Sequence, residues 1–146
     1  MRIDCALLCD AATVREGLLH VLGGGITRAG RSVFPGPLGL TLALRILVHP
    51  TEAGHMHKLV VLLQGEDGQE AARVDIEFGV ADPGTLEPGE QASLPLSLPM
   101  PPQVALPAPG RYSFELLIDG IHQGSVPFMA HLVELSPAPL AQGGEE

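Results

Sequence analysis

The sequence predicts an all-β protein, folded as a two-sheet antiparallel sandwich of about eight strands. Several segments alternate apolar and polar residues with a period of two, which is the pattern of a half-buried strand. No segment keeps a helical period over three turns, and 18 glycines and 14 prolines supply turns between the strands. A closed β-barrel is the alternative architecture for the same set of strands.

Length and charge limit the organisation of the chain and its partners. The 146 residues suit one domain, which we place at 1–135, followed by a mobile tail at 136–146 without apolar periodicity. The net charge is −9 and Lys58 is the only lysine, so we expect no nucleic acid as partner. No apolar run approaches the roughly 18 residues of a membrane span, and no signal peptide is evident, so we expect no membrane contact.

The first segment, residues 3–13, is expected to be a strand whose odd positions face the core, namely Ile3, Cys5, Leu7, Cys9 and Ala11. A three-residue turn at 15–17 would lead into a second strand from Leu18. That turn pairs Thr13 with Leu19 and Ala11 with Val21. The three glycines at 23–25 are expected to end or bend this strand.

The two cysteines indicate the compartment. Cys5 and Cys9 would lie about 13 Å apart on a strand, which is too far for a disulfide. On the inward face they would serve as small buried hydrophobic residues. A reducing, cytoplasmic location is therefore expected.

The middle of the chain predicts three further strands. Residues 38–48 alternate strictly, with six apolar side chains on one face: Leu38, Leu40, Leu42, Leu44, Ile46 and Val48. A hairpin with a two-residue turn at Asp67-Gly68 would join residues 57–63 to 72–78. This turn brings the apolar sets of both strands to one face, with Val61 opposite Val74.

The last third predicts an edge strand, a crossing and a closing hairpin. Prolines on the outward positions of residues 92–100 indicate an edge strand, and residues 101–109 a crossing between sheets. In the final hairpin, core faces agree only if Phe114 pairs with Val126 and Tyr112 with Phe128. We therefore expect an odd-length or bulged loop at 119–121, with Gly120 at positive φ.

Two resemblances add to these predictions. The segment PAPGRYSFELLIDG resembles the tyrosine corner of immunoglobulin-like sandwiches, in which Tyr112 would bond to backbone a few residues upstream. The chain also resembles a family of short bacterial proteins known only as a domain of unknown function. That resemblance is carried by ALLCDAA at 6–12, LLHVLGGG at 18–25 and PGRYSFELLIDG at 109–120. It implies a bacterial, cytoplasmic, immunoglobulin-like sandwich and supplies no catalytic residues.

Few residues suggest a metal, catalytic or binding site. His55 and His57 are candidate metal ligands, because side chains two apart on a strand point the same way. We find no nucleophile with a neighbouring base and expect neither an enzyme nor a cofactor. The tip of the final hairpin is the candidate interaction site, through Asp119, Ile121, His122 and Gln123. The favoured hypothesis is a non-catalytic module that binds a protein partner or forms a homo-oligomer, and the alternative is a metal- or small-ligand-binding sandwich using His55 and His57.

Overall fold

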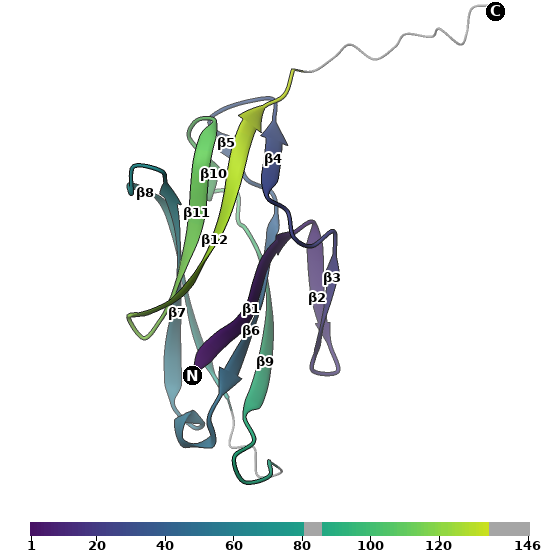
Figure 1. Ribbon diagram of the computed structural model, residues 1–146, viewed down its shortest axis with the longest axis vertical. Coiled ribbons are helices and arrows are strands. Elements are labelled where there is room, and N and C mark those ends of the chain that lie inside the picture. The colour runs from purple at the N-terminus through teal and green to yellow at the C-terminus, as the bar shows by residue number, and fades with distance from the viewer. Residues whose placement is uncertain (81–85, 135–146) are drawn as a thin grey trace, which may run out of the picture.

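The computed structural model describes residues 1–80 and 86–134, and within them two sheets pack face to face (Figure 1). The three-stranded sheet has the order β1 (Arg2–Cys9), β6 (Thr41–Val48), β9 (Ala92–Pro99). The five-stranded sheet has the order β4 (Arg28–Arg31), β12 (Ile121–Leu132), β11 (Gly110–Ile118), β7 (Met56–Gly65), β8 (Glu70–Gly79).

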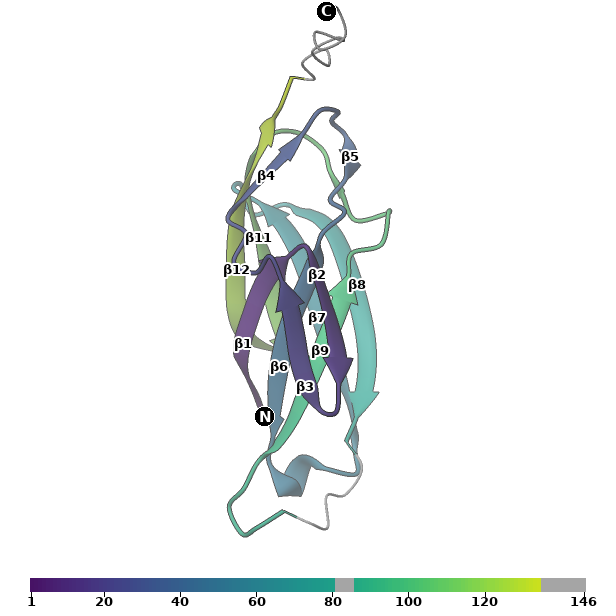
Figure 2. The same cartoon turned by 90° about the vertical axis from the view of Figure 1, so that its right-hand side faces the viewer.

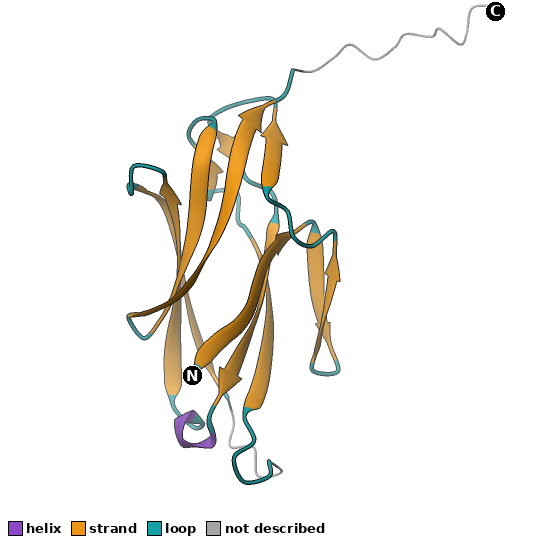
Figure 3. Cartoon of the chain, in the orientation of Figure 1, coloured by secondary structure: helices purple, strands orange, loops and turns teal. Residues whose placement is uncertain are grey.

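Smaller elements complete the described part of the chain (Figure 3). A hairpin is formed by β2 (Ala11–Arg15) and β3 (Leu18–Leu22), and a two-residue ladder by β5 (Gly36–Pro37) and β10 (Ala105–Leu106). One 3-10 turn, η1 (Pro50–Glu52), follows β6. The described residues thus contain more strands than the eight or so expected, because several of these strands are very short.

The all-β sandwich is confirmed, and its two main sheets remain separate sheets that do not close into a barrel. One pairing departs from the expected antiparallel pattern. Strand β4 lies parallel to β12, with Arg28 opposite Met129 and Arg31 opposite Leu132. Parallel neighbours require a long connection between them, and here the segment between the paired residues makes up about two thirds of the chain. Residues 28–31 have no strict alternation, so the sequence alone did not indicate this strand.

The core lies between the facing sides of the two sheets. The expected face of β6 is confirmed, since Leu42, Leu44, Ile46 and Val48 are all 0% exposed. Across the core, β7, β11 and β12 contribute the residues Leu59, Val61, Leu63, Phe114, Leu116 and Phe128. Each such side chain contributes about 2 kcal/mol of hydrophobic free energy when fully buried. The cross-sheet contacts, rather than the short ladders, therefore stabilise the fold.

Strand β1 corrects the first predicted face. A bulge at Asp4 shifts the register, so that Ile3 pairs with Ile46 but Cys5 pairs with Arg45. A one-residue shift sends every later side chain to the opposite face. As a result Ala6 and Leu8 join the core, while Cys5 is exposed and both cysteines are free thiols. The expectation of burial is therefore wrong for Cys5, whereas Cys9 is buried as expected.

The hairpin of β2 and β3 also differs from the predicted register. Its turn has two residues, Glu16 and Gly17, at φ of 53° and 74°, and Arg15 pairs with Leu18. Both positive φ values are those of a turn that matches the twist of a hairpin. The expected pairs of Thr13 with Leu19 and Ala11 with Val21 are therefore wrong by one residue.

This hairpin lies over the outer face of the three-stranded sheet, as Figure 2 shows. The Ser97 hydroxyl on β9 donates to the Ala12 carbonyl at 2.7 Å. Beneath it, Ala43 on the outward side of β6 is 0% exposed. The glycine bend is confirmed by positive φ at Gly23 and Gly25, and the Gly25 amide donates to the Leu8 carbonyl at 2.9 Å.

The predicted phases of the other two hairpins are confirmed. Phe114 pairs with Val126, and Val61 pairs with Val74. The position of the extra residue differs in each case. In β11–β12 the turn has two residues, Asp119 and Gly120, and the bulge lies farther along, at Gln123. Gly120 has the expected positive φ, 81°.

In β7–β8 the register shift lies between Leu63 and Gln64, so that Gln64 pairs with Glu70. The Gly65 amide donates to the Gln69 carbonyl at 3.0 Å. Three residues, 66–68, therefore form this loop instead of the predicted two. In each hairpin the bulge shifts the register by one residue, so that the apolar side chains of both strands lie on the core face, as predicted.

The tyrosine corner is present as predicted. The Tyr112 hydroxyl donates to the Ala108 carbonyl at 2.5 Å and accepts from the Ala108 amide at 3.3 Å. Its ring is 7% exposed and stacks on Phe128 with a centroid distance of 5.7 Å. The two packed sheets together with this corner make the fold an immunoglobulin-like sandwich.

Candidate interaction surface

The predicted histidine pair does not form on one strand. His55 lies in the loop before β7, whereas His57 is on the strand itself. His57 Nδ1 bonds to Asp119 Oδ2 at 2.6 Å, and Nε2 bonds to the Glu52 carbonyl at 2.9 Å. Both ring nitrogens are thus engaged by protein oxygens. Within residues 1–80 and 86–134, no three histidine, cysteine or acidic side chains are grouped closely enough to hold a metal ion.

Asp119 joins the hairpin tip to the neighbouring strand. Besides the bond to His57, its second oxygen accepts from the Lys58 amide at 2.9 Å. The hydrogen bond with His57 lowers the pKa of the Asp119 carboxyl, and the same bond raises the pKa of the His57 imidazole. Asp119 therefore links the β11–β12 turn to β7 through its side chain. Its φ of 50° lies in the left-handed region, which Asp adopts more readily than most residues.

The other predicted tip residues are divided between internal bonds and solvent. His122 Nε2 bonds to Glu115 Oε1 at 2.7 Å, and the Gln123 side chain accepts a long bond from the Ile3 amide at 3.4 Å. Ile121 is 66% exposed. Of the four residues, Ile121 is the one that projects an apolar side chain outward, and an interaction through this tip stays a prediction.

A serine, a histidine and a carboxylate meet near the same tip, which the sequence did not indicate. Ser125 Oγ donates to Glu115 Oε1 at 2.5 Å, and that oxygen also bonds to His122. Ser125 Oγ is 3.5 Å from His122 Nε2. A nucleophilic serine needs the histidine as proton acceptor and the carboxylate on the other ring nitrogen. Here both groups converge on one carboxylate oxygen, so the arrangement does not activate the serine.

Burial alone would raise the pKa of Glu115, but hydrogen bonds from Ser113, Ser125 and His122 together lower it. The carboxylate is therefore ionised near neutral pH and accepts bonds from three side chains at once. This cluster holds β11 and β12 together on their outward side.

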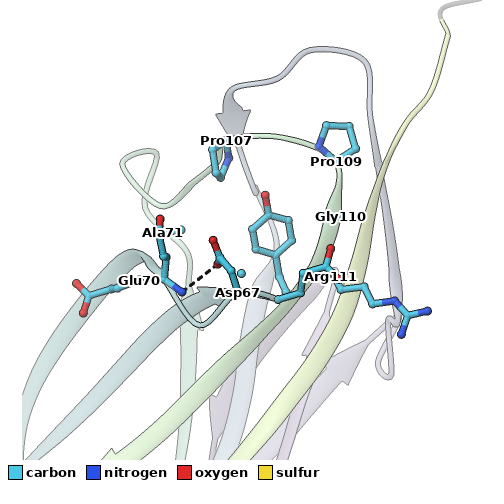
Figure 4. A pocket seen from close by; sticks show the side chains of 11 residues that line it. Asp67, Glu70, Ala71, Pro107, Pro109, Gly110 and Arg111 are labelled. Carbon is cyan, nitrogen blue, oxygen red and sulfur yellow. Dashed lines mark hydrogen bonds between the residues drawn. The ribbon is translucent and has the colours of Figure 1, made fainter.

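A pocket of about 290 Å³ lies between the β7–β8 loop and the segment that enters β11 (Figure 4). Its rim carries Glu66, Asp67, Glu70 and Arg111, and Figure 4 shows the Glu70 and Arg111 side chains directed away from each other. Asp67 accepts from the Gln69 amide at 3.0 Å, as turn aspartates do. The Tyr112 hydroxyl is bonded to Ala108, so the pocket presents no converging set of free polar groups.

The β2–β3 hairpin, which we call the apolar arm (residues 11–22), exposes the largest set of apolar side chains among the described elements. On its outward face Leu18 is 61% and Leu22 is 70% exposed. On the face toward the sandwich, Val14 is 43% and Val21 is 39% exposed. The two outward leucines flank His20 on β3, and several exposed apolar side chains gathered on one small element make the arm a candidate interaction surface.

A groove of about 660 Å³ separates the arm from the sheet beneath it. One wall is formed by Leu19 and Val21 of the arm, and the other by Cys5, Arg45, Ser93 and Pro95 of the sheet. The Arg45 guanidinium is held by Asp4, whose pKa is lowered mainly by that hydrogen bond. The signal for the arm was present in the sequence, since LLHVL carries apolar residues on both faces of a short strand.

Comparisons with known proteins place the chain in a family. Residues 4–131 match the family described as "Family of unknown function (DUF6941)". The chain belongs to this family. The resemblance to a domain of unknown function is thereby confirmed, and the match spans both sheets and the apolar arm.

Among solved structures, the chain is similar to an immunoglobulin-like protein from Pseudomonas aeruginosa, with 12% identity and a TM-score of 0.42. The alignment covers 89% of this chain and 95% of that one. No match to a curated protein was found. In the part of the chain that the structure describes, no helix is long and apolar enough to cross a membrane.

Proposed function

We propose that the protein is a non-catalytic binding module that uses the apolar arm to contact a partner protein. The proposal is supported chiefly by the exposure of Leu18 and Leu22 on one face of the arm. Leaving two leucines in water forgoes hydrophobic free energy that a partner surface would recover on binding. Aligned apolar side chains on a rigid hairpin provide the core of such an interface.

Charge supports the same proposal. The chain carries a net charge of −9, yet the only Asp, Glu, Lys or Arg residues of the arm are Arg15 and Glu16, which lie at its turn. Interface cores are depleted in charged residues relative to the remaining surface. Location is a further part of the proposal: the cytoplasm is the compartment in which the free thiols Cys5 and Cys9 stay reduced.

The test compares two double variants in a cross-linking capture from cell extract. Leu18→Ser with Leu22→Ser changes the arm, and Val33→Ser with Leu132→Ser is the matched control. Both control residues are exposed, at 65% and 58%, and lie outside the arm.

We expect the control and the unchanged protein to recover the same partner, and the arm variant to lose at least ten-fold of it. All three proteins should unfold at the same temperature, because the four side chains are already in water. Equal recovery by both double variants, or no specific partner with any of them, would contradict the proposal.

A further inference from the structure

The outer edge of β8 differs from the other sheet edges in the described residues. Strand β8 ends the five-stranded sheet and pairs with β7 alone (Figure 1). It is ten residues long and contains no proline. An unpaired strand presents amide and carbonyl groups that another strand can bond.

The other edges of the two main sheets are blunted. Strand β9 carries Pro95 and Pro99, which have no amide to offer. Strand β1 is bulged at Asp4 and lies against β12, where the Ile3 amide bonds to the Gln123 side chain. Strand β4 has four residues. Among the edges of the two main sheets, β8 is therefore the best template for a strand from another molecule.

The outward side chains of β8 specify which strand would fit. Arg73 Nε donates to Asp75 Oδ1 at 2.8 Å, and Lys58 Nζ from β7 lies 3.2 Å from Asp75 Oδ2. The side chains of Arg73 and Asp75 are 48% and 39% exposed, so both remain available to a second strand. A carboxylate accepts up to about four hydrogen bonds, which leaves capacity on Asp75.

We propose that β8 pairs antiparallel with β8 of a second copy of this chain, centred on Val74. In that register Arg73 of each copy lies opposite Asp75 of the other, so four charges alternate in sign across the two-fold axis. On the inner side Ala72 lies opposite Ile76, which extends the apolar face of both sheets. The two five-stranded sheets join into one continuous sheet.

Other registers of the same strands are disfavoured by charge. Centring on Asp75 sets Asp75 against its own copy, and centring on Ile76 sets Asp75 against Glu77. Like charges directly opposite destabilise a strand pair. The segment before β11 also flanks Glu70 and Ala71 at the pocket of Figure 4, which confines the pairing to the residues that follow.

Sedimentation velocity over a concentration series tests the proposal. We expect a monomer–dimer equilibrium for the unchanged protein. Arg73→Glu makes positions 73 and 75 both acidic and Asp75→Arg makes them both basic, so each variant alone should dimerise at least ten-fold more weakly. An equimolar mixture of the two should recover the dimer, because each residue then faces its opposite charge.

Two controls locate the contact. Glu77→Gln should leave the dimer unchanged, because Glu77 lies beyond the paired residues 72–76 in the proposed register. The arm variant with Leu18→Ser and Leu22→Ser should also dimerise normally. The dimer through β8 and partner binding by the arm are therefore tested independently of each other. Monomer at every concentration, a dimer lost in Glu77→Gln or in the arm variant, or a mixture that stays monomeric would each overturn the proposal.

Discussion

His57 is held in its protonated form by the two atoms it contacts. The Asp119 carboxylate and the Glu52 carbonyl are both acceptors, at 2.6 and 2.9 Å, so both ring nitrogens must carry protons to bond them. The bond to Asp119 is the main reason that the pKa of His57 is raised. The imidazolium links the β11–β12 turn to η1, two segments far apart in the chain.

The first prediction concerns the pH dependence of this link. A raised histidine pKa contributes stability below the unfolded value of about 6.5, and the contribution is lost as pH rises through the native pKa. The lowered pKa of Asp119 keeps that carboxylate ionised down to acidic pH. Asp119→Asn should therefore cost about 0.5–1 kcal/mol at pH 5.5 and less at pH 9, after allowance for solvent screening.

Urea unfolding at the two pH values measures the difference. Asn keeps the acceptor for the Lys58 amide and tolerates positive φ, so the substitution removes mainly the charge. A cost that grows from pH 5.5 to pH 9 would show that His57 is not protonated in the native protein.

Tyr112 provides the second prediction. Tyr112→Phe keeps the stacking on Phe128 but removes both bonds to Ala108. The expected loss is about 1 kcal/mol, typical of one net hydrogen bond, with the urea m-value unchanged. Equal stability of the variant and the unchanged protein would mean that the corner positions the strand without stabilising it.

These two sites differ in how well the sequence predicted them. The tyrosine corner joins residues four apart, so the local pattern at 108–112 was sufficient. The His57–Asp119 bond joins residues 62 apart and depends on β7 lying beside β11. Alternation predicts which face a residue occupies, but it does not predict which strands become neighbours.

Bulges decide the arrangement at the scale of single elements. In the last hairpin, the two apolar faces match only if one strand contains an extra residue, and the structure confirms this prediction. The extra residue is Gln123, a position that the sequence did not predict. In β1 a bulge at Asp4 left Cys5 exposed, because no hairpin partner was available to test the predicted face, whereas Cys9 is buried as expected. The sequence therefore predicted the core pairs of the last two hairpins, whose strands each have one apolar set to match, but not the register of β2–β3, where LLHVL is apolar on both faces.

The third prediction concerns the turn of the apolar arm. Glu16 holds φ of 53°, which Asn adopts more readily, so Glu16→Asn should stabilise the arm by about 0.5 kcal/mol. Gly17→Ala should destabilise it by about 1 kcal/mol, because φ is 74° there although no atom lies within 4 Å. Amide hydrogen exchange across 11–22 measures both. Protection that moves the same way in both variants would contradict the assigned turn.

For the whole molecule, one core between two sheets implies a single cooperative unfolding transition. Phe114 is 1% exposed and stacks on Phe128 at 5.6 Å between ring centroids. The fourth prediction is that Phe114→Ala costs about 3–5 kcal/mol, against less than about 0.5 kcal/mol for the exposed control Val33→Ala. Differential scanning calorimetry measures both, and comparable losses would contradict the assigned core.

The parallel pairing of β4 with β12 has a consequence for the order in which the protein folds. Strand β4 (residues 28–31) can pair only after residues 129–132 of β12 are in place. The β4–β12 pairing therefore closes a loop of about a hundred residues. Local hairpins such as β7–β8 form in microseconds, whereas contacts of such long range are slow. During synthesis β4 has no partner until almost all of the chain has left the ribosome. Strand β4 therefore docks last, onto a sandwich whose central strands are already paired.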